Sequence, residues 1–527
     1  MKKKGIILAI FFGVIMTTSL AAGVLVRNTP PTSTEDEITI TGTPADNYPD
    51  EQRAEFCGSS IAKSTTFVKE YSIPTFCTNP LAIVTDFEGN VWFAETNTGN
   101  LAKFDPATES FTEYKNPTWP KNGRSMMWGI DYASDGSLWY TDETYDSIWR
   151  FDPQTESYKR LAYPSEGNSL PQKLQVKGSQ IIVNDFTGNK ITFLDPTQSD
   201  EELSYLTLPS PMENAVTADF TIDSENNLWY TNWVYLQGGV LVKFDEEGYR
   251  TAVANTGEEL LPLGEFIDVV SLPENVLAPN GAVIANGKIW LGDTASSNFY
   301  SFDPQTESFV QYLTSDPPAS TYGNSTGVIK TPISRPYWVN TDDSGKLVFN
   351  EQNANRLGVM DLKSETLVEY FVPSMNPNWG DCGDLENCGL AQVFDFSIRG
   401  EKIWFTEWVE NNIGVVDTSK ELPLEIQLDS DKISLSPGES AKVSFVVSPT
   451  TQTDLSEVSL ILADSDEFLN INSDSQKTFQ LDFDAPRPIS ATISASDDAV
   501  SGTFKVLLGA QTDEVAISKY LTVVIES

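Results

Sequence analysis

The pentapeptide Leu138-Trp139-Tyr140-Thr141-Asp142 decides the fold of this chain, because similar pentapeptides recur along it. Seven copies are present, and each is a short run of β-branched and aromatic residues that ends in an acid or its amide, as β-strands entering a loop often do. The copies begin at residues 91, 138, 181, 228, 289, 347 and 403, so they are 47, 43, 47, 61, 58 and 56 residues apart. This period is close to that of one four-stranded propeller blade or somewhat longer. We therefore expect an all-β chain that contains a seven-bladed β-propeller.

A second repeated residue sets the register of the blades. An Asp stands 14 residues after the start of six copies, for example Asp105 and Asp303, whereas the fourth copy reaches Asp245 after 17 residues. The tripeptide Phe-Asp-Pro at three of these places predicts a tight turn in which the Asp side chain bonds the turn backbone. The longer spacing predicts a three-residue insertion within residues 233–238.

The outer strand of the last blade is missing from its expected place. Its pattern, seen as Phe111-Thr112-Glu113-Tyr114, does not follow Asp417 but stands ahead of the first copy as Phe67-Val68-Lys69-Glu70-Tyr71. An unpaired edge strand promotes aggregation. We therefore expect the amino-terminal strand to complete the last blade and close the ring, so that the propeller spans residues 65–420.

Residues 421–527 follow a different pattern. Short alternating runs such as Val443-Ser444-Phe445-Val446-Val447 predict a β-sandwich. The segment lacks the Cys pair and the core Trp of antibody domains, so we describe it only as Ig-like. A spacer or packing role is the simpler interpretation, and a carbohydrate-binding or protein-binding module is the alternative.

The amino terminus predicts export. Three lysines precede the uncharged residues 5–26, which as a helix would span about 33 Å, the thickness of a bilayer's hydrocarbon core. The positive flank predicts that the rest of the chain lies outside the cytoplasm, at the cell surface or secreted. Residues 1–27 are either an uncleaved membrane anchor or a signal peptide cleaved near Ala21 and Ala22. Residues 28–64 are rich in Pro, Thr, Ser and acids, which predicts a stalk.

Export also bears on the four cysteines, because disulfides persist outside the reducing cytosol. Local pairing of Cys57 with Cys77 and of Cys382 with Cys388 is our preferred expectation, although four cysteines allow three connectivities.

Composition excludes several functions. The chain has 34 Lys and Arg against 75 Asp and Glu, a formal charge of −41, which argues against nucleic acid as a partner. It has no histidine, so mechanisms that need an imidazole base or ligand are excluded.

The blade sequences Asp135-Gly136-Ser137-Leu138-Trp139-Tyr140-Thr141-Asp142 and Ile403-Trp404-Phe405-Thr406-Glu407 resemble the virginiamycin B lyase, or streptogramin lyase, family of seven-bladed propellers. The resemblance covers roughly residues 65–420. It implies a lyase that opens a cyclic depsipeptide by elimination, with a metal ion and a histidine base where the central channel emerges. Family members often carry a His before a Gly-Ile pair, where this chain has Trp128, Asn280 and Tyr337. The resemblance therefore implies the fold and not the chemistry.

The last residue of each copy is expected where the second strand of a blade enters the loop to the third. Six carboxylates at these places would ring one face and could bind Ca²⁺ or Mg²⁺. In the simpler alternative each carboxylate bonds its own loop. The six residues are Glu95, Asp142, Asp185, Asp293, Glu351 and Glu407.

Aromatic and basic side chains near the same loops are candidates for binding a ligand. An exposed Trp at a channel mouth suits stacking on a sugar or a ring-bearing ligand. The candidates are Trp128, Trp233, Arg335, Tyr337, Trp379 and Trp408, whereas Trp92, Trp139, Trp229, Trp290 and Trp404 are expected in the core.

The function that fits these patterns is a non-catalytic propeller that binds a small molecule, a glycan or a cell-surface protein on its loop face. One alternative is a lyase-like enzyme in which Tyr337 or a ring carboxylate replaces the histidine base, assisted by Mg²⁺. Another alternative is a structural component of the cell envelope.

Overall fold

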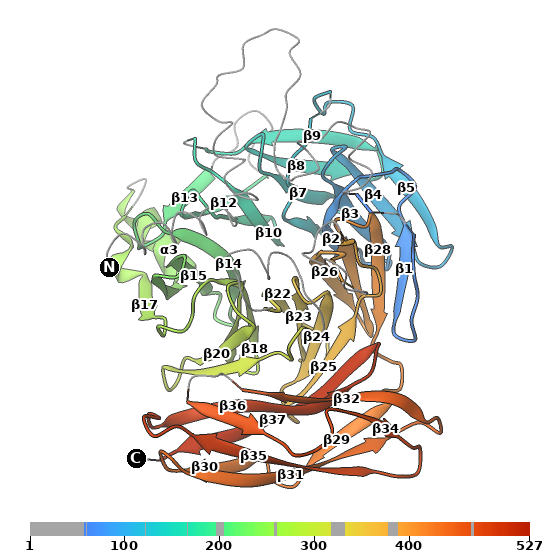
Figure 1. Cartoon of the computed structure of the whole chain (residues 1–527). Helices are drawn as coiled ribbons and strands as arrows, with labels where there is room; N and C mark the ends of the chain where they lie inside the picture. Colours follow the sequence, from blue (N-terminus) through green and yellow to red (C-terminus); the bar gives the residue numbers. More distant parts are fainter. Residues whose placement is uncertain are drawn as a thin grey trace, which may run out of the picture.

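The computed structural model describes residues 57–58, 61–121, 123–165, 167–196, 205–257, 261–317, 333–377, 388–464 and 468–526. These residues form an all-β structure, in which antiparallel sheets surround a central axis and the carboxy-terminal strands lie against one side of the ring (Figure 1). The expected membrane span and nearly all of the expected stalk lie outside the described residues. Within the described ranges no helix is both long and apolar enough to cross a membrane.

The ring repeats one unit of four consecutive antiparallel strands. The first three units are β2 (Pro80–Thr85), β3 (Val91–Glu95), β4 (Asn100–Asp105) and β5 (Ser110–Tyr114); β6 (Ile130–Tyr132), β7 (Leu138–Asp142), β8 (Ser147–Asp152) and β9 (Ser157–Ala162); and β10 (Pro171–Lys177), β11 (Gln180–Asp185), β12 (Lys190–Leu194) and β13 (Tyr205–Pro209).

The next units follow the same order. They are β14 (Val216–Ile222), β15 (Leu228–Val234), β16 (Gly238–Phe244) and β17 (Ile267–Ser271); β18 (Pro279–Ala285), β19 (Lys288–Asp293), β20 (Asn298–Asp303) and β21 (Ser308–Leu313); β22 (Pro336–Thr341), β23 (Leu347–Glu351), β24 (Arg356–Asp361) and β25 (Thr366–Phe371); and β26 (Val393–Arg399), β27 (Lys402–Glu407) and β28 (Asn412–Asp417) with β1 (Val68–Ser72).

Every copy of the repeated pentapeptide is the second strand of such a unit. All five residues of β3 and of β7 are buried, because neighbouring sheets pack on both faces of these strands. The outer strand β5 alternates between half-buried and exposed positions. The tryptophans expected in the core are buried, as predicted: Trp92, Trp139, Trp229, Trp290 and Trp404.

In five of the seven copies, the fourth residue of the pentapeptide joins its sheet to the next one, whereas the first and fifth copies have Ala94 and Gly292 at this place. The hydroxyl of Thr141 donates to the carbonyl of Gln172 at 3.0 Å, in the first strand of the next sheet. Equivalent bonds run from Thr231 to the Pro279 carbonyl at 2.7 Å, from Thr406 to the Leu81 carbonyl at 2.7 Å, from Asn184 to the Thr217 carbonyl at 2.9 Å and from Asn350 to the Val393 carbonyl at 2.7 Å. The repeat therefore encodes contacts between sheets as well as strands.

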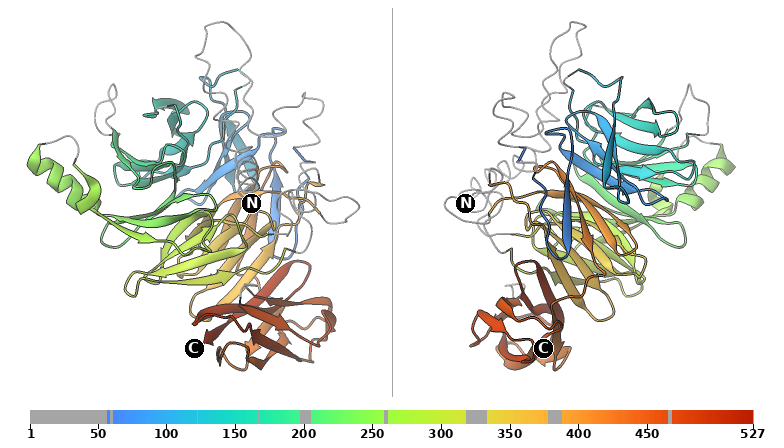
Figure 2. Two further views of the ribbon diagram at one scale, coloured as in Figure 1. Left: turned by 60° about the vertical axis from the view of Figure 1, so that its left-hand side comes forward. Right: turned by 90° about the vertical axis from the view of Figure 1, so that its right-hand side faces the viewer.

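The repeated Asp behaves as the turn chemistry predicts. Asp105 accepts a hydrogen bond from the backbone N–H of Ala107, and Asp303 accepts one from Gln305. In the fourth unit, however, Asp245 caps the helix α3 (Glu246–Thr256), which the sequence patterns did not predict. Figure 2 shows α3 projecting from the rim of the ring, and the short helix η2 (Leu263–Glu265) follows it.

The three-residue insertion of the fourth copy lies where the sequence predicted it. Strands β15 and β16 pair as far as Val234 and Gly238, two residue pairs beyond Asn232, the last residue of the copy. The insertion therefore lengthens the hairpin.

The amino-terminal strand lies where its pattern predicted. β1 pairs with β28 in antiparallel register, with Val68 opposite Val416 and Tyr71 opposite Ile413. The strand order is β1-β28-β27-β26, so the earliest described strand completes the sheet made by the latest strands of the ring.

The carboxy-terminal strands form two layers. One sheet has the order β29 (Leu424–Leu428), β31 (Ser440–Pro449), β35 (Arg487–Ala495) and β33 (Leu469–Asn472). The other contains β30 (Lys432–Leu435), β37 (Val515–Ile525), β36 (Gly502–Gln511), β32 (Leu455–Ala463) and β34 (Thr478–Leu481), and it continues into the ring because β37 pairs with β25.

The tail therefore shares a nine-stranded sheet with the ring. Thr366 lies opposite Lys519 across the junction. The hydroxyl of Tyr520 donates to the carbonyl of Leu313 at 2.6 Å, and the ammonium of Lys505 lies 2.5 Å from a carboxylate oxygen of Glu365. The sequence boundary at residue 421 is thus not a break in hydrogen bonding.

The cysteines agree with the expectation as far as they are described. Cys57 and Cys77 form a disulfide, with their Cα atoms 5.2 Å apart. Cys388 is also disulfide-bonded, and Cys382 lies outside the described residues.

We expect Val68→Ala to lower the free energy of unfolding by about 2 kcal/mol, because it removes two buried methyl groups where β1 closes the ring. The matched control is Lys69→Ala on the same strand, whose exposed ion pair with Glu109 should contribute less than about 1 kcal/mol. Urea unfolding measures both. Equal effects would contradict a structural role for β1.

We expect the ring and the tail to unfold in a single calorimetric transition, because one sheet runs through both. Tyr520→Phe should destabilise this transition by about 1 to 3 kcal/mol, since it leaves the buried Leu313 carbonyl unpaired. Tyr145→Phe is the control, because the Tyr145 hydroxyl has no hydrogen-bond partner among the described residues. Two separate transitions, with Tyr520→Phe moving only one, would show that the parts are independent.

Candidate functional site

The first strands of the sheets line a central channel. They are β2, β6, β10, β14, β18, β22 and β26, and residues from all of them line one cavity. We call the end where second strands pass into third strands the loop face, and the other end the hairpin face. The first strands are buried at the loop face, as at Leu81 and Ala82, and more exposed at the hairpin face, as at Val84 and Thr85. The two ends therefore have different environments.

The six carboxylates predicted to ring the loop face are all fully buried. Asp185 accepts hydrogen bonds from the backbone N–H groups of Leu170 at 2.7 Å and Gly188 at 2.9 Å. Asp293 likewise accepts hydrogen bonds from the backbone N–H groups of Ala278 and Ala295, which belong to the same unit of the ring. The other four carboxylates also have partners in their own sheets: Glu95 with Thr98, Asp142 with Ser125 and Trp149, Glu351 with Arg356, and Glu407 with Asn412.

These contacts favour the alternative in which each carboxylate fastens its own loop. Burial raises the pKa of Glu95 to about 8 and also raises the pKa values of Asp142, Asp185 and Asp293. Nowhere in the described ranges do three acidic or cysteine side chains converge as a metal site requires. The structure does not bring the predicted Ca²⁺ or Mg²⁺ ligands together.

Three of the predicted ligand-binding residues meet in one aromatic layer at the loop face. Its members are Trp128, Tyr337, Trp338, Phe394 and Trp408. The ring of Trp128 stacks on Tyr337 with centroids 6.5 Å apart and meets Phe394 edge-on at 5.5 Å, and Phe394 meets Trp408 at 5.2 Å. The aromatic layer therefore joins three different sheets across the channel.

The expected exposure of these aromatic residues was wrong. Trp128 is 3% exposed, Tyr337 7% and Trp408 4%, because their rings pack on one another. Trp233 is also buried and packs against Phe186. Arg335 is half-buried with its guanidinium 5.6 Å from the Tyr337 ring, and Trp379 lies outside the described residues.

Buried polar atoms without a hydrogen-bond partner stand around the aromatic layer. Leaving such an atom unpaired costs about 1 to 3 kcal/mol, so each one calls for an explanation such as a ligand or a water molecule. Within the described part of the chain they include Trp233 Nε1, Asn280 Nδ2, Gln352 Nε2 and Oε1, Asn353 Oδ1 and Gln392 Oε1. The backbone places them beside the predicted site, since Gln352 bonds Arg335 and Gln392 bonds Trp408 through main-chain groups.

Of the three side chains that stand where the lyase family often has histidine, those of Trp128 and Tyr337 are hydrogen-bonded inside the protein, whereas Asn280 Nδ2 has no partner among the described residues. The indole N–H of Trp128 donates to Glu143 at 2.8 Å, and the Tyr337 hydroxyl accepts from the Gln172 amide at 3.3 Å. Burial raises the pKa of Tyr337 to about 12, so this phenol stays protonated near neutral pH. It is therefore a poor general base.

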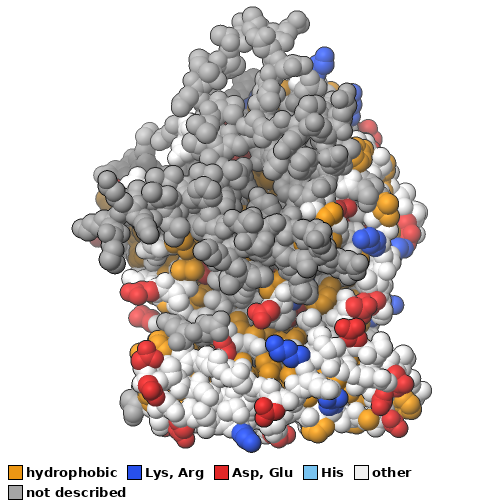
Figure 3. Space-filling model, viewed as in Figure 1, with side chains coloured by type: hydrophobic (Ala, Val, Ile, Leu, Met, Phe, Trp, Pro, Cys, Tyr) orange, Lys and Arg blue, Asp and Glu red, His pale blue; other side chains and the backbone are white. Residues whose placement is uncertain are grey.

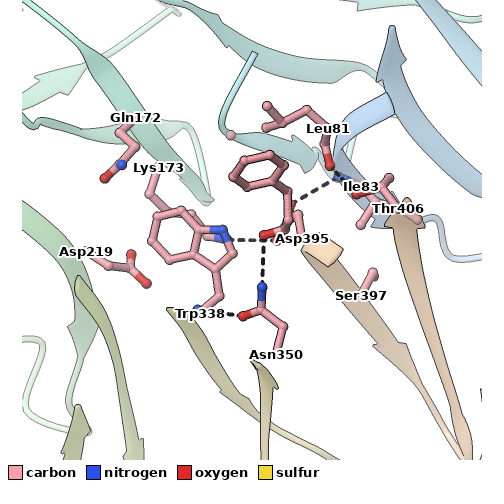
Figure 4. A network of polar contacts seen from close by, with 12 residues as sticks. Leu81, Ile83, Gln172, Lys173, Asp219, Trp338, Asn350, Asp395, Ser397 and Thr406 are labelled. Carbon is pink, nitrogen blue, oxygen red and sulfur yellow. Dashed lines mark hydrogen bonds and ion pairs between the residues drawn. The ribbon is translucent and has the colours of Figure 1, made fainter. Parts of the chain in front are cut away.

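The cavity of about 360 Å³ lies toward the hairpin face, and its charged residues were missed in the sequence. Figure 4 shows Lys173, Asp219 and Asp395 around the indole of Trp338. The Lys173 ammonium lies 3.5 Å from Asp395 and 4.5 Å from the centre of the Trp338 ring. An acid followed by an aromatic residue in the first strand, at Asp131, Asp219 and Asp395, was the available signal.

Each of these acids also links two neighbouring first strands. Asp131 accepts from the backbone N–H of Val176 at 2.7 Å, and Asp395 accepts from Ile83 at 3.1 Å. Burial raises the pKa of Asp219 to about 6. Burial alone would lower the pKa of Lys173, but Asp395 and Asp219 hold it above its usual value. Lys173 therefore stays protonated in the cavity.

Sequence comparison finds no matching family model and no matching curated protein. Among solved structures, the chain is similar to selenomethionine-substituted virginiamycin B lyase from Staphylococcus aureus, with 18% identity, a TM-score of 0.50, and coverage of 66% of this chain and 98% of that one. A catalytically inactive variant of that enzyme with quinupristin gives the same values. A streptogramin B lyase structure matches with 18% identity, a TM-score of 0.49, and coverage of 66% and 96%. Residues of this chain thus follow the β-propeller fold of virginiamycin B lyase, and the likeness at this identity concerns the fold.

Proposed function

We propose that this chain is an extracytoplasmic, non-catalytic β-propeller of seven blades that binds a ligand through its loop face. In this proposal residues 65–420 form the binding propeller, and residues 421–527 form an Ig-like sandwich that braces it. The observation that carries the proposal is the loop-face site itself, an aromatic layer surrounded by buried amides that have no partner among the described residues. Such a site is organised for binding.

The chemistry of the site indicates what it would bind. Amide groups such as Gln352 offer both donors and acceptors, and indole or phenol rings offer flat apolar surface. A ligand that presents rings and hydrogen-bonding groups together would satisfy both, which fits a small molecule, a glycan or a loop of a cell-surface protein. Ca²⁺ or Mg²⁺ has less support, since the six carboxylates already bond their own loops.

Two observations support an extracytoplasmic protein without nucleic-acid partners. The Cys57–Cys77 disulfide is of the kind that persists in oxidising compartments. On the described part of the face in Figure 3, Lys and Arg side chains are scattered among acidic ones and form no basic patch. Attachment to the membrane through residues 1–27 remains part of the proposal.

The alternative function is a lyase with a replaced base. It has the support of the shared fold with virginiamycin B lyase. Against it stand the absence of histidine and the high pKa of Tyr337.

We expect quinupristin to remain cyclic when incubated with the purified chain, with or without millimolar Mg²⁺. Elimination would leave the mass unchanged, so chromatographic retention is the measurement. Linearisation that EDTA abolishes would overturn the non-catalytic proposal in favour of the alternative.

We expect Gln352→Met to raise the free energy of unfolding by about 1 kcal/mol in the absence of ligand, because it removes a buried amide that makes no hydrogen bond in the described structure. Asn350→Leu is the matched control in the adjoining strand. Its amide donates to the Val393 carbonyl at 2.7 Å, so this change should destabilise by about 1 to 3 kcal/mol. Destabilisation by Gln352→Met would mean that the amide serves the fold and not a ligand.

A further inference from the structure

We propose that the cavity at the hairpin face is a second binding site, and that it takes a small zwitterion of the free α-amino acid type. The site is separate from the loop-face site of the proposed function. The inference rests on three observations: an open cavity, two hydrogen-bond donors among its lining residues, and three carboxylates that line the same space.

The cavity has the size and position that such a ligand needs. Its volume is about 360 Å³, and residues from every first strand of the ring line it. Hydrogen bonds join three pairs of neighbouring first strands, as Asp395 joins Ile83, and these bonds order the cavity wall. An ordered wall lowers the ordering cost of binding.

The donors are Lys173 and Trp338. The side chain of Lys173 is 28% exposed, and the bond to Asp395 at 3.5 Å is long for an ammonium that carries three donor hydrogens. Trp338 is 2% exposed and lines the cavity, yet its Nε1 has no partner in the described ranges. A ligand carboxylate would accept hydrogen bonds from both groups.

The acceptors are Asp131, Asp219 and Asp395. All three line the cavity, and Asp219 and Asp395 are almost completely buried. Each accepts one backbone N–H from a neighbouring strand, and each has one further donor: the backbone N–H of the next residue for Asp131 and Asp219, and Lys173 for Asp395. Lone pairs remain on each carboxylate. A ligand ammonium would donate hydrogen bonds to these remaining lone pairs.

Charge balance distinguishes a zwitterion from other ligands. An anion alone would meet three carboxylates, and a cation alone would meet the Lys173 ammonium over the Trp338 ring. A ligand that carries both charges can place each beside its complement at little net electrostatic cost. The polar side chains of the cavity therefore match a zwitterion better than either half of one.

The two sites adjoin at Trp338, which belongs to the aromatic layer and also lines the cavity. Trp338 lines the cavity, whereas its neighbour Tyr337 lies at the loop face and meets the Trp338 ring edge-on at 4.7 Å. A ligand in the cavity would touch only the Trp338 side of this layer. Lys173 lines the cavity and is not a member of the aromatic layer, so a Lys173 variant tests the cavity apart from that layer.

The first test is a thermal-shift screen of the full-length chain against the twenty amino acids at 10 mM, followed by calorimetric titration of the strongest binder. Its decarboxylated amine and its deaminated acid serve as the two half-ligands. We expect saturable binding of at least one amino acid and at least tenfold weaker binding of both halves, since each half loses charge-assisted bonds. The absence of any shift, or equal binding of one half, would overturn the proposal.

The second test uses two variants with a matched control. Trp338→Phe removes the indole N–H together with one of the two fused rings, keeps an aromatic ring in place, and should weaken binding about 3- to 10-fold. Lys173→Met should weaken binding more than tenfold. Lys177→Met, at the end of the same strand β10 and outside the cavity lining, should leave binding unchanged. If Lys173→Met fails to fold, Trp338→Phe decides. Unchanged affinity in Trp338→Phe would place the ligand elsewhere, whatever happens at the loop face.

Discussion

The structure depends on hydrogen bonds that run from one sheet to the next at the central axis. The hydroxyl or amide at the fourth place of a repeat donates to a carbonyl of the neighbouring first strand, as Thr141 does to Gln172 and Asn350 to Val393. These carbonyls face another sheet and would otherwise be buried without a partner. The bond from Thr406 to Leu81 joins the last sheet of the ring to the first, whereas the first and fifth copies, with Ala94 and Gly292 at this place, have no side chain that could make the bond.

The repeated carboxylates serve the same architecture one residue further along. Asp185 and Asp293 each accept two or more backbone N–H groups, which orders the loops where second strands end. Burying a carboxylate is costly unless it is hydrogen-bonded, and the raised pKa of Glu95 reflects that cost. A residue that recurs in nearly every sheet therefore serves the fold. Residues that serve a function are expected at positions where the sheets differ.

The local features of the fold were predictable because they follow from short patterns. The pentapeptides marked every second strand, the turn aspartates marked the hairpins, and the misplaced pattern at residues 67–71 predicted the pairing of β1 with β28. Features that depend on three-dimensional packing were not predictable. The helix α3 interrupts a unit with no periodic signal, and the pairing of β37 with β25 joins segments about 150 residues apart. The burial of Trp128 depends on Phe394 and Tyr337, which come from other sheets.

The two ends of the channel show how a repeated scaffold acquires different chemistries. Near the loop face, equivalent positions hold Trp128, Gln172, Asn280 and Tyr337, which are neutral and share no common role in the repeat. Toward the hairpin face the positions hold Asp131, Lys173 and Asp219, so that end is charged. The bonds from the repeated fourth residue end on backbone carbonyls of the first strands, so first-strand side chains that bond no neighbouring strand can vary without removing these bonds. Asp131 and Asp395 are different, because their carboxylates also join neighbouring first strands. The first strands are thus the part of this fold in which the units differ most in the chemistry of their side chains.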